Sequence, residues 1–255
     1  MIYVFGGGFM TGERDLKHQL PYYKTLVDSG FVVVAIDYRL GLKNQDEKSY
    51  RRPNVRRNAV NMAVEDLFSA TRYIVDNADK WNIDTAKIII SGSSAGAITV
   101  LQADYELANR TALAQGMPNN FRYAGVISFS GALLTHQATL NYARFPSPIL
   151  LFHGTGDKLV ASGKITVLNR SWMGSAAIAE TFKKKGYPYY LYTYRNLGHE
   201  IAVVPMYENK AEIFSFIRTF IDQGKDLQIE QTYFDKDRKK LFDINPKEFY
   251  KRNKK

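Results

Sequence analysis

The chain has 255 residues, of which 45% are hydrophobic, and this size and composition suit a single α/β domain with a large core. It contains no cysteine, which excludes disulfides, thiolate metal sites and a cysteine nucleophile, and no run of about 18 apolar residues predicts a membrane span. The formal net charge is +10, and residues 235–255 supply much of it, with nine Lys and Arg against four Asp and Glu.

Strand and helix patterns alternate along the chain. The expected strands are apolar or β-branched runs that are apolar on both faces, which predicts a mostly parallel central sheet with helices on both faces. The expected helices have apolar residues at helical spacing. The predicted strands cover residues 3–5, 31–38, 87–91, 124–130, 149–153 and 189–194, of which 189–194 is the last, and the predicted helices cover residues 58–79, 97–109, 175–185 and 207–222.

Three connections between these elements stand out. Residues 41–57 are polar and basic, and we expect them to form a surface loop. Residues 132–148 and 158–174 are longer connections, and long connections above a sheet often form the mouth of a substrate site.

A run of three glycines, Gly6-Gly7-Gly8, follows the first predicted strand. Glycines at this point allow backbone N–H groups to face into a site, as they do in an oxyanion hole. A flexible or phosphate-binding turn is the alternative. The pattern Gly-x-x-x-x-Gly-Lys-Ser/Thr is absent, however, and Gly-x-Gly-x-x-Gly is not completed by a downstream ribose-binding acid, so we favour the oxyanion interpretation.

The pattern Gly-x-Ser-x-Gly occurs at residues 92–96, between a predicted strand and a predicted helix. Alone it occurs often by chance, but strand, tight turn and helix form the context in which such a serine is a nucleophile. The turn would expose Ser94 at the end of the sheet, and the N-terminus of the next helix favours negative charge there. We therefore identify Ser94 as a candidate nucleophile, with the N–H of Ala95 as one oxyanion donor.

An acid and a histidine should follow such a serine in chain order, each on a loop after a strand. Asp157 follows the strand at 149–153, although aspartates after strands are also common turn formers. His199 follows the strand at 189–194. The other three histidines fit less well, because His18 and His136 lie outside the order and His153 lies within a strand, where we expect packing or a backbone hydrogen bond.

Several segments together resemble the α/β-hydrolases of the carboxylesterase type. The resemblance is close over residues 2–100 and looser through the segments that contain Asp157 and His199, which are similar to those of smaller bacterial esterases. The segments that carry the close part are Tyr3-Val4-Phe5-Gly6-Gly7-Gly8-Phe9-Met10-Thr11-Gly12, Ile36-Asp37-Tyr38-Arg39-Leu40-Gly41, Ala63-Val64-Glu65-Asp66, Trp81-Asn82-Ile83-Asp84 and Gly92-Ser93-Ser94-Ala95-Gly96.

The resemblance implies an α/β-hydrolase fold and assigns the site residues. By it, the catalytic triad is Ser94, Asp157 and His199, and the oxyanion donors are Gly7, Gly8 and Ala95. The family needs no cofactor and no metal, so we expect neither.

The chain also departs from the family pattern. Many relatives have histidine before the glycine run, where this chain has Phe5. The family sheet starts with two strands before the oxyanion segment, and we expect this sheet to lack them. We expect residues 1–234 to form an N-terminally truncated catalytic domain and residues 235–255 a basic C-terminal tail or helix. Arg39 and Asp66 are expected to form a buried ion pair behind the site.

The expected function is that of a serine carboxylic-ester hydrolase that works through an acyl-enzyme. The resemblance extends to esterases that remove acetyl or feruloyl groups from plant glycans, so a small-molecule or glycan ester is the expected substrate. Two alternatives stay open. One is a non-catalytic binding protein with the α/β-hydrolase fold, and the other is a serine peptidase of the prolyl-oligopeptidase type.

The basic C-terminal residues leave two interpretations open, an anionic partner or a solubilising surface helix. No nucleic-acid motif accompanies the charge, so no nucleic acid is expected, and the oligomeric state is undetermined. We expect a cytoplasmic protein if Met1 is the native start, and a periplasmic or secreted one if a signal peptide and further strands precede it.

Overall fold

The computed structural model of the chain describes residues 1–50, 52–136, 139–167 and 170–253. A seven-stranded sheet forms its centre, in the order β10-β9-β6-β4-β3-β1-β2, and all neighbouring strands are parallel. This confirms the mostly parallel sheet predicted from the sequence. Its strands are β1 (Ile2–Val4), β2 (Val34–Ile36), β3 (Ile89–Ser93), β4 (Gly125–Phe129), β6 (Ile149–Gly154), β9 (Tyr189–Tyr194) and β10 (Gln228–Tyr233).

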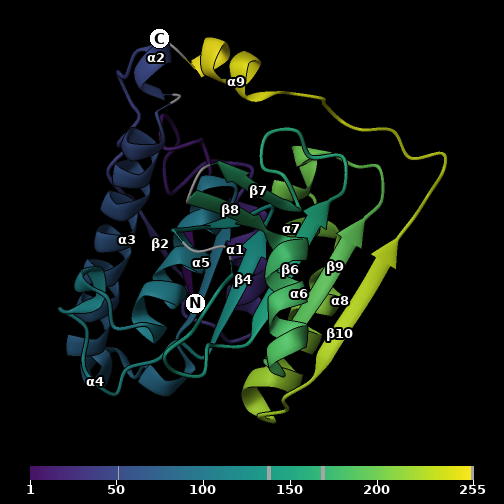
Figure 1. Cartoon of the computed structure of the whole chain (residues 1–255). Coiled ribbons are helices and arrows are strands. Elements are labelled where there is room, and N and C mark those ends of the chain that lie inside the picture. The colour runs from purple at the N-terminus through teal and green to yellow at the C-terminus, as the bar shows by residue number, and fades with distance from the viewer. Residues whose placement is uncertain (51, 137–138, 168–169, 254–255) are drawn as a thin grey trace.

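Helices cover both faces of this sheet (Figure 1). α5 and α6 lie on the face toward the viewer, with α3 packed against α5, and α1, α7 and α8 lie on the far face. The helices are α1 (Leu20–Asp28), α2 (Glu47–Tyr50), α3 (Pro53–Asp76), α4 (Ala78–Trp81), α5 (Ala95–Ala108), α6 (Ser175–Lys185), α7 (Pro205–Glu208), α8 (Lys210–Phe216), continued by π-helical turns at Ile217–Asp222, and α9 (Pro246–Asn253).

The central strands are buried on both faces, as helices on both sides require. Every residue of β1, β3, β4 and β6 is buried, which explains why apolar residues do not alternate with exposed polar ones in these strands. The core between sheet and helices is rich in aromatic rings, and Phe129 stacks on Phe152 with ring centroids 5.4 Å apart. Among the described helices, none has the length and apolar character needed to cross a membrane.

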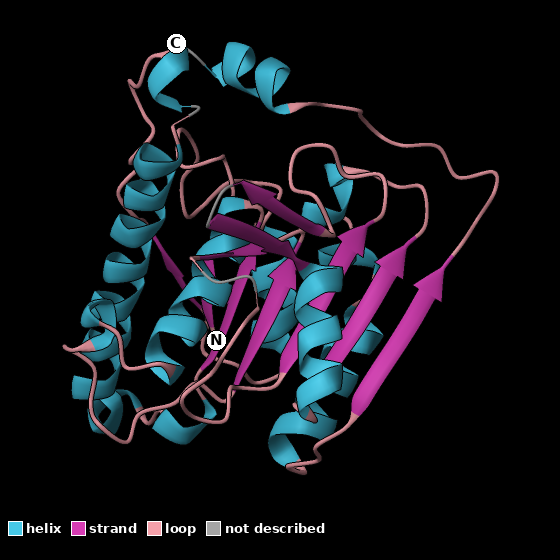
Figure 2. Cartoon of the chain, in the orientation of Figure 1, coloured by secondary structure: helices cyan, strands magenta, loops and turns pink. Residues whose placement is uncertain are grey.

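A second sheet of three antiparallel strands lies above the carboxyl ends of the main sheet (Figure 2). Its order is β5-β8-β7, and its strands come from the two long connections that the sequence predicts as a substrate mouth. The connections are therefore not simple loops, although they do lie over the end of the sheet where Ser94 is placed. The strands are β5 (Ala132–Thr135), β7 (Lys164–Val167) and β8 (Arg170–Gly174).

Several predicted boundaries are wrong. The helix expected from residue 58 begins at Pro53, because proline suits the first helical turn, so the expected loop at 41–57 contains α2 and the start of α3. The strand at 189–194 is not the last, since β10 follows it. The sequence analysis also missed α1, and the expected helix at 207–222 is divided into α7, α8 and the π-helical turns.

The C-terminal residues return to the main body of the molecule. We call residues 234–253 the C-terminal strap, because they leave β10, pass over the carboxyl ends of the strands and end in α9 beside α2 (Figure 1). Tyr250 is buried, and its hydroxyl donates to the carbonyl of Gln45 over 2.9 Å. The predicted tail therefore contains a helix, and one face of that helix packs against the domain.

Candidate active site

Ser94 lies at a strained turn between β3 and α5. Its φ of 50° and ψ of −113° fall where residues other than glycine rarely lie, a conformation that costs of order 1–3 kcal/mol. Gly96 makes the turn possible, because a Cβ atom there would lie 2.0 Å from the carbonyl oxygen of Val4. The turn places the serine at the carboxyl end of the sheet and at the N-terminus of α5, where the helix dipole favours negative charge.

His199 and Asp157 complete a chain of hydrogen bonds that begins at Ser94. His199 Nε2 lies 2.8 Å from Ser94 Oγ, and His199 Nδ1 lies 2.7 Å from Asp157 Oδ2. Since a carboxylate only accepts, Nδ1 carries the proton and Nε2 is free to accept one from the serine. The structure thus brings together the three side chains that the sequence places on separate loops more than 40 residues apart.

The environment of Asp157 keeps its carboxyl group ionised. Burial alone raises its pKa, but the hydrogen bond that His199 donates, with the electrostatic attraction of that ring, outweighs burial and lowers the pKa below its ordinary value. The second carboxylate oxygen, Oδ1, accepts from the backbone N–H groups of Leu159 and Val160, each over 2.9 Å. Asp157 is therefore oriented from both sides.

His153 supports the loop that carries Asp157. Burial lowers the pKa of His153, so the ring is neutral. Its Nε2 donates to the carbonyl of Val160 over 2.9 Å, and its Nδ1 accepts from the Ser175 hydroxyl over 2.7 Å. The backbone hydrogen bond that the sequence predicts for this histidine is confirmed.

The glycine run lies directly beside Ser94. Gly7 and Gly8 have φ angles of +110° and +64°, and the carbonyl of Gly7 accepts from the N–H groups of Met10 and Thr11, which closes a tight turn. Gly8, Ala95 and Ser94 line the same small pocket. Within the described residues, the N–H groups of Gly8 and Ala95 donate to no main-chain carbonyl, so both remain able to bind an oxyanion.

Phe5 occupies the place where many relatives have histidine. Its ring is buried and stacks on Tyr38, with centroids 4.5 Å apart and an angle of 28° between the planes. The Tyr38 hydroxyl donates to the carbonyl of Phe5 over 3.0 Å. An aromatic pair and one backbone hydrogen bond therefore hold the start of the glycine turn.

The pocket at Ser94 has a volume of about 70 Å³ and mostly apolar walls. It opens toward a larger cavity of about 470 Å³, which shares part of its lining. The residues common to both are Arg56, Leu159, Trp172 and Pro246, and Phe249 of the C-terminal strap also lines the small pocket. The sequence predicts residues 158–174, which include Leu159 and Trp172, as part of a substrate mouth, but it singles out none of these five residues, because they carry no motif.

The Arg39–Asp66 pair forms as predicted, but it is not buried. Arg39 Nε lies 2.9 Å from Asp66 Oδ1, and Arg39 also pairs with Glu65 over 2.7 Å. The Arg39 side chain is 51% exposed, so solvent screens the pair and its contribution to stability is small.

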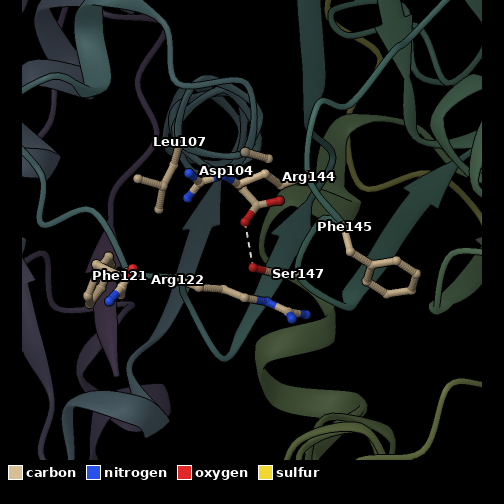
Figure 3. A pocket seen from close by; sticks show the side chains of 9 residues that line it. Asp104, Leu107, Phe121, Arg122, Arg144, Phe145 and Ser147 are labelled. Carbon is tan, nitrogen blue, oxygen red and sulfur yellow. Dashed lines mark hydrogen bonds between the residues drawn. The ribbon is translucent and has the colours of Figure 1, made fainter.

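Another cavity, of about 350 Å³, lies at the opposite end of the sheet (Figure 3). Its one buried carboxylate, Asp104, lies 2.6 Å from the hydroxyl of Ser147, and burial raises the pKa of Asp104. Arg122 and Arg144 at its rim donate to the carbonyls of Pro146 and Asn119. These hydrogen bonds join loops of the fold, so we assign them a structural role. Over the part of the chain that the structure describes, no cluster of three or more histidine or acidic side chains is arranged to hold a metal ion.

The chain is similar to known esterases in sequence and in structure. Residues 1–134 match the model of the family described as BD-FAE, which is more than half of the chain. Esterase LipI of Mycobacterium tuberculosis is 30% identical over 96 residues, which cover 38% of this chain and 25% of that protein. Ethyl acetate hydrolase of Pseudomonas putida is 27% identical over 114 residues, or 45% of this chain and 31% of that protein. The matched segments thus span about a quarter to a third of these relatives.

The fold is that of the α/β-hydrolases. The structure of native esterase 2 from the planctomycete Thermogutta terrifontis superposes with a TM-score of 0.61 and 21% identity, covering 86% of this chain and 81% of that one. The propionate-bound form of the same esterase gives a TM-score of 0.60, covering 85% and 82%. At this level of identity the likeness concerns the fold, and it confirms the fold class predicted from the sequence.

Proposed function

Because this chain belongs to the BD-FAE family, we propose that it is a serine carboxylic-ester hydrolase that works through an acyl-enzyme. One observation carries the proposal. Ser94, His199 and Asp157 form an unbroken hydrogen-bonded chain at a strained strand-to-helix turn, next to a glycine turn with unpaired N–H groups. A nucleophile, a base, an orienting acid and an oxyanion site are the parts that acyl transfer requires.

The proposed reaction proceeds in two halves. Ser94 Oγ attacks the ester carbonyl while its proton passes to His199 Nε2, and the negative oxygen binds to the N–H groups of Gly7, Gly8 and Ala95. The tetrahedral intermediate collapses, and His199 gives the proton to the leaving alcohol. A water molecule then loses its proton to His199 and attacks the acyl group on Ser94. This releases the acid and restores the serine. Asp157 holds the tautomer of His199 throughout and stabilises its cation.

The small pocket at Ser94 supports a short acyl group. Its volume of about 70 Å³ is small beside the larger cavity of about 470 Å³. An acetyl group suits that space, whereas a feruloyl group would have to extend into the larger cavity. We therefore propose acetyl esters, and among them esters of glycans, because the larger cavity has an aromatic wall at Trp172.

A panel of 4-nitrophenyl esters tests the proposal. The purified protein should hydrolyse the acetate, with a kcat/KM that falls as the acyl chain lengthens beyond butyrate. Ser94→Ala should lower kcat by a factor on the order of 10⁴ to 10⁶ and leave the melting temperature within a few degrees. Equal turnover by Ser94→Ala would refute the assignment of the nucleophile, and a preference for long chains would refute the acetyl assignment.

A further inference from the structure

The larger cavity beside the serine pocket has basic walls. Arg56 and Arg57 enter it from the first turns of α3, Arg170 from β8 and Lys158 from the loop after β6. Among the described residues that line it, none is Asp or Glu. We call it the arginine cavity. Its volume of about 470 Å³ lies in the range of ordinary small-molecule sites.

Among the described residues, none of the three arginines forms an ion pair with a carboxylate. No ion pair joins Arg56 or Arg170 to an acid there, and Arg57 instead donates to the backbone carbonyl of Leu134 over 3.0 Å. Burial lowers the pKa of Arg57, although the charge of Glu106 opposes the effect. Arginines on a protein surface ordinarily form ion pairs with carboxylates or lie in open water. A partly buried guanidinium without a counterion destabilises the folded state. An anionic ligand would remove that cost.

The fourth cation differs from the other three. Lys158 already pairs with Asp243 of the C-terminal strap over 2.5 Å, so we do not include it in the anion site. The aromatic wall lies beside the arginines instead. The Arg56 guanidinium lies over the ring of Trp172, 5.8 Å from its centroid. The cavity thus combines a flat apolar surface with guanidinium groups that match a planar anion such as a carboxylate.

The small pocket and the arginine cavity would each hold one half of an ester substrate. The acyl carbon must reach Ser94, and with the proposed acetyl group in the small pocket the alcohol half occupies the arginine cavity. We propose that the substrate is an acetylated sugar acid, whose carboxylate binds to Arg56, Arg57 and Arg170 while its ring packs on Trp172. This inference rests on the proposed function, and it specifies the class of alcohol that the enzyme would release.

Two esters that differ in one group provide the test. They are methyl glucuronoside and methyl glucoside, each acetylated at the same hydroxyl, so that only the carboxylate distinguishes them. At low salt we expect kcat/KM to be about tenfold higher for the glucuronoside, as one charge-assisted contact allows. The difference should shrink as salt is added, because ions screen the guanidinium–carboxylate attraction.

Variants assign the preference to the cavity. Arg170→Gln should remove most of the glucuronoside preference, and Arg170→Lys should restore part of it, because lysine keeps the charge but not the planar geometry. Lys80→Gln, which removes an exposed charge from α4, is the matched control and should leave the preference unchanged. A preference that survives Arg170→Gln and Arg56→Gln alike would overturn the inference.

The remaining outcomes separate this inference from the proposed function. Turnover of both sugars with equal kcat/KM would overturn the inference and leave esterase activity standing. A higher kcat/KM for 4-nitrophenyl hemisuccinate than for 4-nitrophenyl butyrate, with equal values for the two sugar esters, would also overturn it. The cavity would then bind a carboxylate on the acyl half of the ester. If neither sugar ester is hydrolysed, the Kd of each sugar ester for the Ser94→Ala protein provides the test. A lower Kd for the glucuronoside supports the inference, and equal Kd values overturn it.

Discussion

His153 and Asp157 lie in buried positions with Nε2 and Oδ2 only 3.6 Å apart, at the same carboxylate oxygen that accepts from His199. Because the His153 ring is neutral, it forms no ion pair with Asp157. It donates to the carbonyl of Val160, whose own N–H donates to Asp157, and so it holds the acid loop in place. The acid of the proposed triad is therefore supported by a second histidine.

Replacement of His153 should loosen that loop. In His153→Ala, the Ser175 hydroxyl and the Val160 carbonyl lose a buried partner, which typically costs about 1–3 kcal/mol in each case before relaxation. We expect a lower free energy of unfolding by urea and a lower kcat, because the orientation of Asp157 relaxes. A kcat that stays at the wild-type value would show that His153 only packs.

The lowered pKa of Asp157 makes stability depend on pH in a defined range. A carboxyl whose pKa is depressed by folding stabilises the protein above its unfolded pKa, near 3.8, and this contribution is lost as the pH falls through the folded value. Asp157→Asn should therefore lose less stability than the wild type as the pH falls below about 4. Urea unfolding across this range measures it, with the exposed Asp79→Asn as control. Parallel curves for wild type and Asp157→Asn would contradict the account.

Phe249 of the C-terminal strap limits the small pocket. Its ring packs so close to Gly8 that a Cβ atom there would lie 2.5 Å from it. Phe249→Ala should enlarge the pocket and raise the kcat/KM for 4-nitrophenyl butyrate relative to the acetate. Phe242→Ala, in the same strap but outside the pocket, is the control. An unchanged ratio in Phe249→Ala would mean that the strap does not restrict the acyl group.

The Tyr38 hydroxyl holds the start of the glycine turn. Tyr38→Phe keeps the stack on Phe5 but removes the hydrogen bond to the Phe5 carbonyl, which should cost about 1 kcal/mol of stability. We also expect a lower kcat with little change in KM, since the proposed oxyanion donors would act mainly in the transition state. If Tyr38→Phe loses stability but keeps the wild-type kcat, the Tyr38 hydroxyl has a role in folding only.

The sequence predicts those parts of the molecule whose structure is determined by a short stretch of residues, such as an apolar strand or a glycine turn. The apolar runs of β3, β4 and β6 reflect burial on both faces, and the serine turn needs glycines at fixed positions. Chain order then selected His199 and Asp157, and the structure brings both to Ser94. β10 was missed because it lies at the edge of the sheet, where its mostly exposed residues lack an apolar run.

The walls of the pockets could not be predicted in this way. Trp172, Arg56 and Phe249 meet only because a connection between strands, the start of a helix and the C-terminal strap converge above the sheet. The sequence predicts residues 158–174 as part of a substrate mouth, but it does not indicate that Trp172 meets Arg56 and Phe249. The sequence predicts a tail or helix at residues 235–255, but it does not predict the burial of Tyr250, which depends on a partner, Gln45, some 205 residues away.

Labelling with a fluorophosphonate probe tests the central claim most directly, because the probe reacts only with a serine that a base has activated and forms a stable adduct. The account predicts one adduct per chain, mapped by mass spectrometry to the peptide with Ser94, and none in Ser94→Ala or His199→Ala. Hydrolysis of 4-nitrophenyl acetate should be lost in step with labelling. A folded wild-type protein that neither labels nor hydrolyses the ester, or one that labels equally after Ser94→Ala, would contradict the account.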